Sequence, residues 1–162
     1  MRALCEAPQM MLYYADIPYE YKMVWDHYGS SWAEVKKNII FNRLPILIIN
    51  EDRYIWQSNT IIRYLSNLTK TKPSDEFQLA YCDAVFESTH EMFSPLNPTI
   101  NMTFGEKYNS NKKKLLEDIL PNSLNNFEKL LQNSSGNFFI GNDPYYCDFN
   151  AYHHFSMCLI LD

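Results

Sequence analysis

One proline constrains the fold of this chain more than any other residue. Pro45 stands at the head of an aliphatic run, and because it has no N–H to give to a strand ladder it suits the first position of a strand. If the peptide bond before it is cis, the N–H and C=O of Leu44 face outward and are open to an extended ligand. Further along, Gln57 and Ser58 open a helix, where Ser58 can act as the cap and free N–H groups favour a carboxylate. The segment is predicted to contain strand 46–49, turn 50–53, strand 54–56 and helix 59–65, which together predict a small peptide-binding device.

The residues before Pro45 predict a mixed α/β unit. The apolar stretch 10–14 predicts a helix, and residues 19–24 are rich in β-favouring side chains and predict a strand. Ser31 followed three residues later by Glu34 is a capping box, which predicts a short helix over residues 32–37. The expected order through residue 65 is therefore helix, strand, helix, strand, strand, helix.

A polar stretch, residues 69–73, reads as a linker between a first domain, 1–68, and a second domain, 74–162, that is predicted to be entirely helical. The second domain begins with a helix at 74–76, and Pro95 and Pro98 are expected to end it. Its predicted apolar face consists of Phe77, Tyr81, Ala84, Val85, Ser88 and Met92.

A second long helix is predicted over residues 110–132, with a kink at Pro121, and a last helix is predicted from near Pro144. The apolar stripe of the second helix comprises Leu115, Leu116, Ile119, Leu124, Phe127, Leu130 and Leu131.

Composition excludes several classes of partner. The net charge is −5, with 14 Lys and Arg against 19 Asp and Glu, so no broad basic surface for nucleic acid is predicted. No apolar run approaches the roughly 20 residues that span a bilayer, so no membrane partner is expected. The four cysteines show neither a CxxC nor a metal-ligand spacing, which argues against thioredoxin-like redox chemistry and predicts reduced thiols in the cytoplasm.

Residues 43–65 resemble the glutathione-binding half of the cytosolic glutathione transferases. The resemblance extends to residues 15–21, 32–36 and 139–149 and is closest to the sigma class, which includes the haematopoietic-type prostaglandin D synthases. It implies an α/β thioredoxin-like N-terminal domain followed by an all-α C-terminal helical domain, the glutathione transferase fold truncated at both ends. Glutathione is the implied co-substrate, small electrophiles are the implied substrates, and the implied assembly is a homodimer.

The same resemblance implies roles for eight residues. After Pro45 in its cis form, the backbone of Leu44 would pair with the cysteinyl part of glutathione, while Gln57 and Ser58 would hold the γ-glutamyl carboxylate. Trp32, Lys36 and Arg43 fall where the class binds the glycyl end, and two cations with an indole N–H suit a carboxylate. Packing for Trp32 and solvation for Lys36 are the alternative readings. Glu91 stands where the class has an aspartate that reaches the neighbouring subunit's ligand.

Other residues near these motifs have weaker implied roles. Because His90 stands where a carboxylate lies near a divalent cation in the prostaglandin synthases, no magnesium site is predicted. Asp148 matches the family's buried helix-start aspartate, but Tyr145 replaces the Ser or Thr of the capping box, at an expected cost of about 1 kcal/mol. His153 and His154 are adjacent and do not share a helix face, so they are read as packing or surface residues.

The tyrosine that activates the glutathione sulfur in the family has no counterpart here, since Met1 and Arg2 already align with the turn after the family's first strand. The first hypothesis is nonetheless a glutathione transferase, given as a partial chain. A second hypothesis is a non-catalytic glutathione-binding or structural protein of the S-crystallin type. A prostaglandin isomerase is a narrower form of the first.

Overall fold

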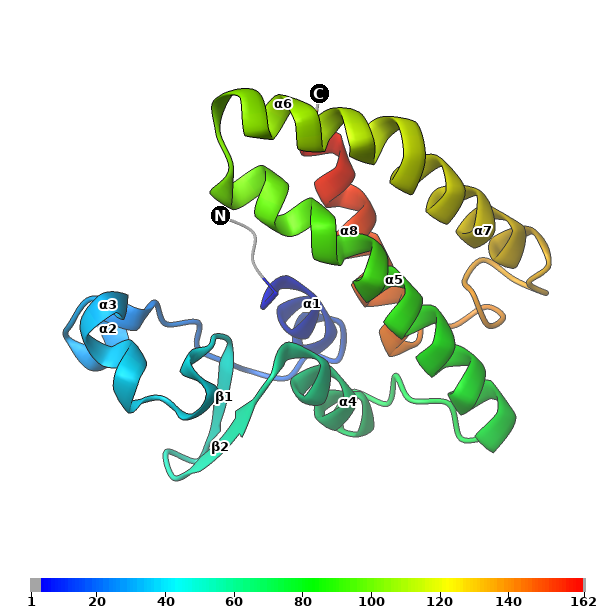
Figure 1. Ribbon diagram of the computed structural model, residues 1–162. Helices are drawn as coiled ribbons and strands as arrows, with labels where there is room; N and C mark the ends of the chain where they lie inside the picture. The colour runs from blue at the N-terminus through cyan, green and yellow to red at the C-terminus, as the bar shows by residue number, and fades with distance from the viewer. Residues whose placement is uncertain (1–3, 162) are drawn as a thin grey trace. The chain divides into compact units, whose positions relative to one another are not determined.

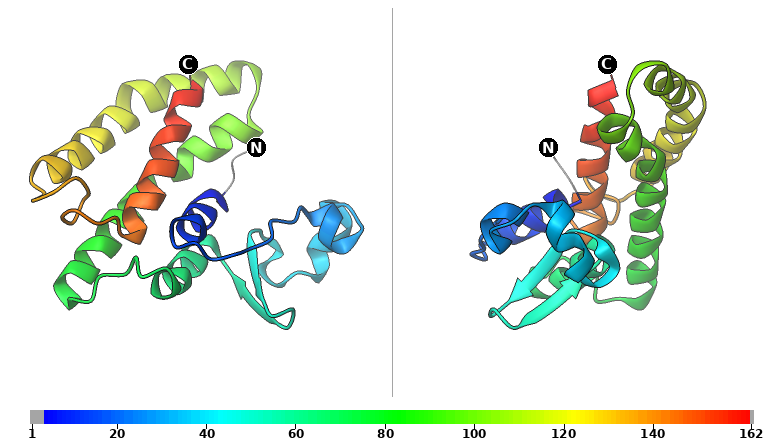
Figure 2. Two further views of the ribbon diagram at one scale, coloured as in Figure 1. Left: turned by 180° about the vertical axis from the view of Figure 1, so that it is seen from behind. Right: turned by 60° about the vertical axis from the view of Figure 1, so that its left-hand side comes forward.

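The computed structural model describes residues 4–161 and divides the chain into two compact units, Met1–Thr71 and Lys72–Asp162 (Figures 1 and 2). Met1 and Arg2, on which the alignment with the family's first turn rests, lie outside the described residues, as does Asp162. The first unit comprises α1 (Glu6–Tyr14), α2 (Val24–Tyr28), α3 (Trp32–Val35), η1 (Lys36–Asn38), η2 (Ile40–Asn42), β1 (Ile46–Ile49), β2 (Arg53–Trp56) and α4 (Ser58–Leu68).

The centre of the first unit is a hairpin covered by helix α4. Strands β1 and β2 pair antiparallel, with Ile46 opposite Trp56 and Ile49 opposite Arg53. The connecting turn places Asn50 at φ 50°, a conformation that asparagine tolerates better than most residues. Helix α4 packs against both strands and against α1, and its buried face comprises Ser58, Ile61, Ile62, Leu65 and Ser66. The predicted hairpin and the helix that follows it are confirmed.

The predicted strand at 19–24 is wrong. Residues 19–23 have no regular secondary structure, and Val24 is the first residue of the short helix α2. Among the described residues, the sheet holds only β1 and β2, so the segment 19–23 has no neighbouring strand with which to share hydrogen bonds. Its side chains are exposed, and Glu20 and Lys22 form a surface ion pair of 2.7 Å.

Farther along the first unit, helix α3 begins as predicted. The Glu34 carboxylate accepts hydrogen bonds from the Ser31 amide at 3.0 Å and from the Ser31 hydroxyl at 2.8 Å. The helix is shorter than expected, because it changes to the 3-10 helix η1 at Lys36.

The second unit is helical. It comprises α5 (Glu76–Met102), α6 (Gly105–Lys114), the π-helical segment η3 (Leu115–Ile119), α7 (Leu120–Gln132), α8 (Tyr146–Cys158) and the 3-10 helix η4 (Leu159–Leu161). Helices α5 and α8 lie side by side and form its main packing interface (Figure 1). The core side chains at this interface include Cys82, Val85, Phe86, Phe93, Leu96, Cys147, Ala151 and Met157.

The expectation that Pro95 and Pro98 end the first long helix is wrong, because α5 continues through both prolines to Met102. Each proline removes one backbone hydrogen bond, which leaves the carbonyls of Glu91 and Ser94 without their usual donors. Both of these residues are exposed, so water can replace the missing donors. The expected apolar face was also partly wrong: Phe77 is 79% exposed, and Ala84 and Ser88 are exposed, whereas Val85 and Met92 are buried.

The predicted continuous helix over 110–132 is also corrected. The helix starts earlier, at Gly105, and its α-helical course is interrupted by η3 just before Pro121. There, the Leu120 N–H donates to the Leu115 carbonyl five residues earlier, which makes a wider, π-helical turn. This wider turn lies directly before Pro121, which has no N–H to donate. Leu115 and Phe127 of the predicted stripe are buried, as is Leu120, whereas Leu116, Leu124 and Leu131 are exposed.

Candidate functional site

The open end of the hairpin brings two backbone segments together. Because Ile46 pairs with Trp56, residues 44–45, which precede β1, and residues 57–58, which follow β2, flank the same open end of the hairpin. The Leu44–Pro45 peptide bond is cis, and Leu44 is 43% exposed. Among the described residues, no hydrogen bond of the Leu44 backbone is formed, so its N–H and C=O are available to an extended ligand.

Gln57 and Ser58 form the junction between β2 and α4. Gln57 has φ 69° and ψ 120°, a region that non-glycine residues rarely occupy and that is enriched at ligand-binding sites. The first backbone bond of α4 runs from the Ile61 N–H to the Gln57 carbonyl at 2.9 Å. The N–H groups of residues 58–60 therefore precede the helical ladder and can bind an anion.

The expectation that Ser58 caps α4 is wrong. Gln57 is the cap residue, and Ser58 is the first residue of the helix, where its hydroxyl can no longer reach back to the amides of the first turn. Instead, the Ser58 hydroxyl donates to Asn59 Oδ1 at a long 3.4 Å. Ser58 is 8% exposed and therefore sits in the wall of the site rather than at its rim.

Three further predicted residues lie on the segment that precedes the hairpin. Trp32 begins α3 and is half-buried, Lys36 begins η1 and is exposed, and Arg43 is exposed immediately before Leu44. Arg43 thus adjoins the open end of the hairpin through the chain itself. Within the described residues, no hydrogen bond or ion pair joins Trp32 or Lys36 to that end, so their shared role stays a prediction.

Glu91 lies on α5 in the second unit and is exposed. One residue earlier, His90 is half-buried, with its Nδ1 buried and without a hydrogen bond in the described part. Across residues 4–161, no group of three or more His, Cys, Asp or Glu is arranged to hold a metal.

Asp148 is held in the second unit as the sequence motif predicts. Its Oδ1 accepts from the Phe139 amide at 3.0 Å and its Oδ2 from the Tyr145 amide at 2.9 Å. Tyr145, at the cap position of α8, makes no side-chain cap hydrogen bond. Burial raises the pKa of the Asp148 carboxyl, although the two amides act in the opposite direction. The aspartate therefore ties the loop before α8 to the first turn of the helix.

The structure also shows a buried polar network that the sequence did not reveal. The Asn150 amide donates to Thr89 Oγ1 at 2.8 Å, and Thr89 in turn donates to the Phe86 carbonyl at 2.8 Å. His154 joins this network through its Nδ1, which lies 3.1 Å from the Thr89 carbonyl. His153 and His154 are 1% and 0% exposed, so of the two expected roles, packing and surface, they have the first.

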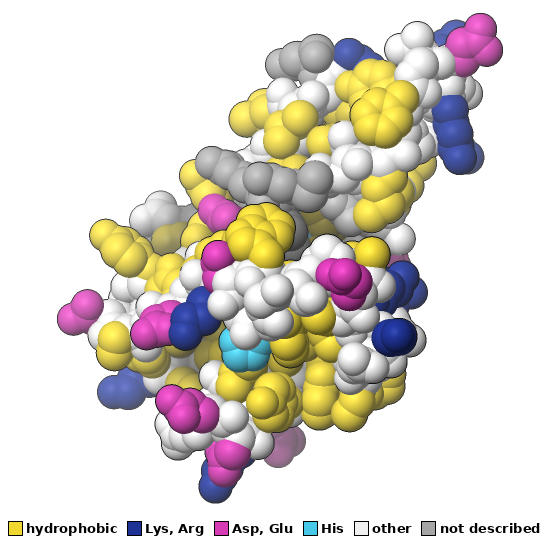
Figure 3. Space-filling model, turned by 90° about the vertical axis from the view of Figure 1, so that its left-hand side faces the viewer, with side chains coloured by type: hydrophobic (Ala, Val, Ile, Leu, Met, Phe, Trp, Pro, Cys, Tyr) yellow, Lys and Arg dark blue, Asp and Glu magenta, His cyan; other side chains and the backbone are white. Residues whose placement is uncertain are grey.

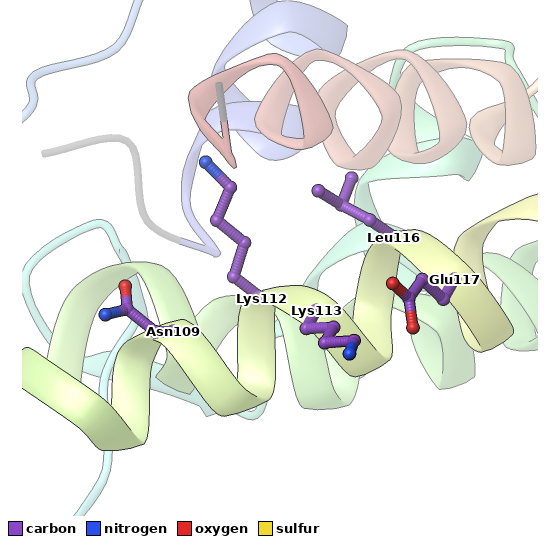
Figure 4. A pocket seen from close by; sticks show the side chains of 5 residues that line it. All are labelled: Asn109, Lys112, Lys113, Leu116 and Glu117. Carbon is purple, nitrogen blue, oxygen red and sulfur yellow. The ribbon is translucent and has the colours of Figure 1, made fainter.

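A depression among the described residues lies on α6 and η3. It is shallow, measures about 380 Å³ and is lined by Asn109, Lys112, Lys113, Leu116 and Glu117 (Figure 4). None of the predicted glutathione-binding residues belongs to it. Within residues 4–161, no helix has both the length and the apolar character needed to cross a membrane.

Comparison with known proteins identifies the family. Residues 1–67 match the model of the glutathione S-transferase N-terminal domain, and residues 90–160 match that of the glutathione S-transferase C-terminal domain. The chain belongs to the glutathione S-transferase family. The family assignment and the α/β-plus-helical fold class predicted from the sequence are thereby confirmed.

Relatives of this glutathione S-transferase family member are longer than the chain. This chain is 32% identical over 132 residues to a glutathione S-transferase of Plasmodium yoelii yoelii, and the aligned region covers 76% of this chain and 60% of the relative. The Pi-class glutathione S-transferase of Onchocerca volvulus superposes with a TM-score of 0.84 at 26% identity, covering 100% of this chain and 75% of that one. Rat hPGDS, solved in complex with a quinoline, superposes with a TM-score of 0.85 at 25% identity, and the superposition covers 100% of this chain and 78% of rat hPGDS.

Proposed function

We propose that this chain binds glutathione at the open end of the β1–β2 hairpin and belongs to a transferase that conjugates the glutathione thiolate to small electrophiles. One observation carries the proposal. The unpaired Leu44 backbone, which follows Arg43, and the free N–H groups at the start of α4 flank the same open end of the hairpin. A peptide ligand can add as a short strand along Leu44, while its carboxylate binds at the helix start.

In this proposal the ligand has two negative ends. Gln57 and Ser58 hold the γ-glutamyl carboxylate, because the Ser58 hydroxyl and the free amides are donors. Trp32, Lys36 and Arg43 hold the glycyl carboxylate through one indole N–H and two cations. Glu91 faces the ligand amine of a second subunit.

Isothermal titration with glutathione tests the binding site. Ser58→Ala removes one charge-assisted hydrogen bond worth about 1.5–3 kcal/mol, so we expect the affinity to fall tenfold or more. Thr60→Ala is the matched control, because Thr60 lies two residues further in the same first turn, its side chain is exposed, and its substitution is expected to leave the affinity unchanged. Equal affinity of Ser58→Ala and the unaltered chain would refute the assignment.

A non-catalytic glutathione-binding or structural protein is the second candidate. It is favoured because the first tyrosines of the chain, Tyr13 and Tyr14, stand at the end of α1 and are 83% and 55% exposed. Neither belongs to the hairpin end at which the glutathione sulfur would lie. Retention on immobilised glutathione without conjugation of a general aromatic electrophile supports this candidate, and conjugation at an ordinary rate rejects it.

A prostaglandin isomerase is a narrower form of the transferase proposal. Its support is the structural likeness to rat hPGDS. Incubation of the chain with a prostaglandin endoperoxide and glutathione distinguishes it, because a plain conjugating enzyme yields no isomerised product.

We further infer a homodimer in the cytoplasm. Ile40 and Phe41 expose 53% and 60% of their surface, and Phe41 packs edge-on against Trp56 at 6.3 Å between ring centroids. Hydrophobic side chains reach the surface on the face shown in Figure 3. Exposed aromatics of this size favour a partner surface. Light scattering decides the assembly: Phe41→Ala is expected to yield monomer, and a monomeric unaltered chain would reject the dimer.

The proposed location in the cytoplasm has separate support. The four free cysteines fit a reducing compartment, which cell fractionation tests.

A further inference from the structure

Three histidine rings gather at the interface of α5 and α8. The ring centroid of His154 lies 5.4 Å from that of His153 and 5.9 Å from that of His90. On its other side, the His154 ring stacks on Phe93 at 4.0 Å and an interplanar angle of 4°. His154 is fully buried, so this cluster belongs to the core of the helical unit and not to its surface.

Two groups contact Nδ1 of His154: the Thr89 carbonyl, an acceptor, lies 3.1 Å away, and the Asn150 amide nitrogen, a donor, lies 3.3 Å away. In the protonated ring both nitrogens carry a hydrogen, so Nδ1 can donate to the carbonyl, whereas Nε2 needs an acceptor of its own. It is buried and has no hydrogen-bond partner among the described residues. A proton added at Nε2 would therefore place a charge in the core without an acceptor.

We propose that this cluster makes the pairing of α5 and α8 an acid-sensitive latch, which stays closed while His154 is neutral and opens when His154 gains a proton. Opening removes the imidazolium from the core and lets water solvate it. The bond from Nδ1 to Thr89 and the stacking on Phe93 are lost in the same step, so protonation and separation of the two helices are linked.

The surrounding groups do not supply a counter-charge. His153 and His90 are the two titratable groups that bear on the pKa of His154, and both lower it. The Cys158 thiol donates to the His154 carbonyl at 3.6 Å, and η4 carries no titratable side chain. The other ionisable groups of the neighbouring helices are Glu76, Tyr81, Cys82, Asp83, Glu87 and Glu91 on α5, Tyr146, Cys147, Asp148 and Tyr152 on α8, and the exposed Glu128 and Lys129 on α7.

The size of the effect follows from linkage. Burial, with the two neighbouring imidazoles, lowers the pKa of His154 to about 3, whereas the unfolded value is about 6.5. The neutral form is favoured in the folded unit, so its stability is complete above about pH 6.5 and is lost as the pH falls toward 3. Between about pH 7.5 and pH 5, His154 alone raises the opening equilibrium about 30-fold. Asp148 acts in the opposite direction, because its pKa is raised in the folded state.

The interface carries its own reporters. Cys82 on α5 and Cys147 on α8 are both 0% exposed, so their thiols react only when the helices separate. Dithiodipyridine labels thiols even in mildly acidic solution. The protection of each cysteine is the ratio of its labelling rate in the denatured chain to its labelling rate in the intact chain at the same pH. Cys5, which is half-buried in the first unit, is the internal control.

We expect the protection of Cys147 to fall about 30-fold from about pH 7.5 to about pH 5, and that of Cys5 to change much less. His154→Gln removes most of this dependence, whereas His27→Gln, at an exposed position in α2, preserves it. Should His154→Gln not fold, hydrogen exchange of the α8 amides in the unaltered chain, corrected for the intrinsic rate, gives the same pH dependence. Protection that stays constant over this range, or that falls equally in a folded His154→Gln variant, would overturn the proposal.

Discussion

Two substitutions of Gln57 distinguish the backbone strain at this residue from the contribution of its carboxamide to glutathione binding. Gln57 occupies φ 69° and ψ 120°, where a side chain costs about 1–3 kcal/mol. Gln57→Ala and Gln57→Gly both remove the carboxamide, but only glycine removes the Cβ. Glycine loses about 0.4–1 kcal/mol through the greater freedom of the unfolded chain. We therefore expect Gln57→Gly to be more stable than Gln57→Ala by about 1 kcal/mol, and both to bind glutathione equally weakly.

Urea denaturation followed by tryptophan fluorescence measures this difference. All three tryptophans, Trp25, Trp32 and Trp56, lie in the first unit and report on its unfolding. Thr60 supplies the matched pair, because it is exposed on regular α4 backbone, where glycine is less stable than alanine by about 1 kcal/mol. The sign of the Gly–Ala difference must reverse between positions 57 and 60. The same sign at both positions would show that Gln57 is not strained.

Two further substitutions test the second unit and its loops. Asp148→Ala leaves the Phe139 and Tyr145 amides without an acceptor and should lower the free energy of unfolding by about 3 kcal/mol. Asp143→Ala, at an exposed position, is the control and should lower it by less than about 0.5 kcal/mol. Unfolding followed by far-UV circular dichroism measures both. A Cβ at Gly136 would lie 2.2 Å from the Gly141 carbonyl oxygen, whereas at Gly29 it meets nothing within 4 Å. Gly29→Ala should lower the free energy of unfolding by roughly 1 kcal/mol, because of its positive φ alone. Gly136→Ala should lower it by well over that amount, and equal losses in the two variants would contradict the close approach of Gly136 to Gly141.

Local signals predicted the hairpin and its following helix, and the family resemblance implied the Asp148 motif; each depends on residues close in sequence. Pro45 marks the start of a strand, and Asp148 meets its two amides within nine residues along the chain. The strand at 19–24 was predicted from side-chain preference, but a strand also needs a neighbour to share its hydrogen bonds, and preference does not specify one. The site residues Leu44 and Ser58 flank the same end of the hairpin because β1 pairs with β2, in a register that the connecting turn sets.

Proline was the least reliable signal in the helical unit. Helix α5 passes Pro95 and Pro98 at a place where the residues that lose a donor, Glu91 and Ser94, are exposed, and a local pattern does not indicate which residues are exposed. The buried network of Thr89, Asn150 and His154 could not be predicted either. Its members are 61 to 65 residues apart across α5 and α8, and only the packing of the two helices brings them together.

The two units differ in how their stability and their proposed function are coupled. In the first unit, β1 is only half-buried, β2 is partly exposed, and a two-stranded hairpin is marginal on its own, so α1 and α4 supply most of the apolar burial. The proposed ligand contacts of this unit fall on the hairpin end and the first turn of α4. A ligand that joins Leu44 to the start of α4 must therefore stabilise this unit by mass action, by about 2.7 kcal/mol at one hundred times its dissociation constant. In the helical unit only Glu91 is proposed to meet a ligand, that of a second subunit, and in our proposal the closure of α5 on α8 depends on neutral histidines. Glutathione should thus act mainly on the first unit and acid on the second, the one raising the stability of the first unit and the other lowering that of the second.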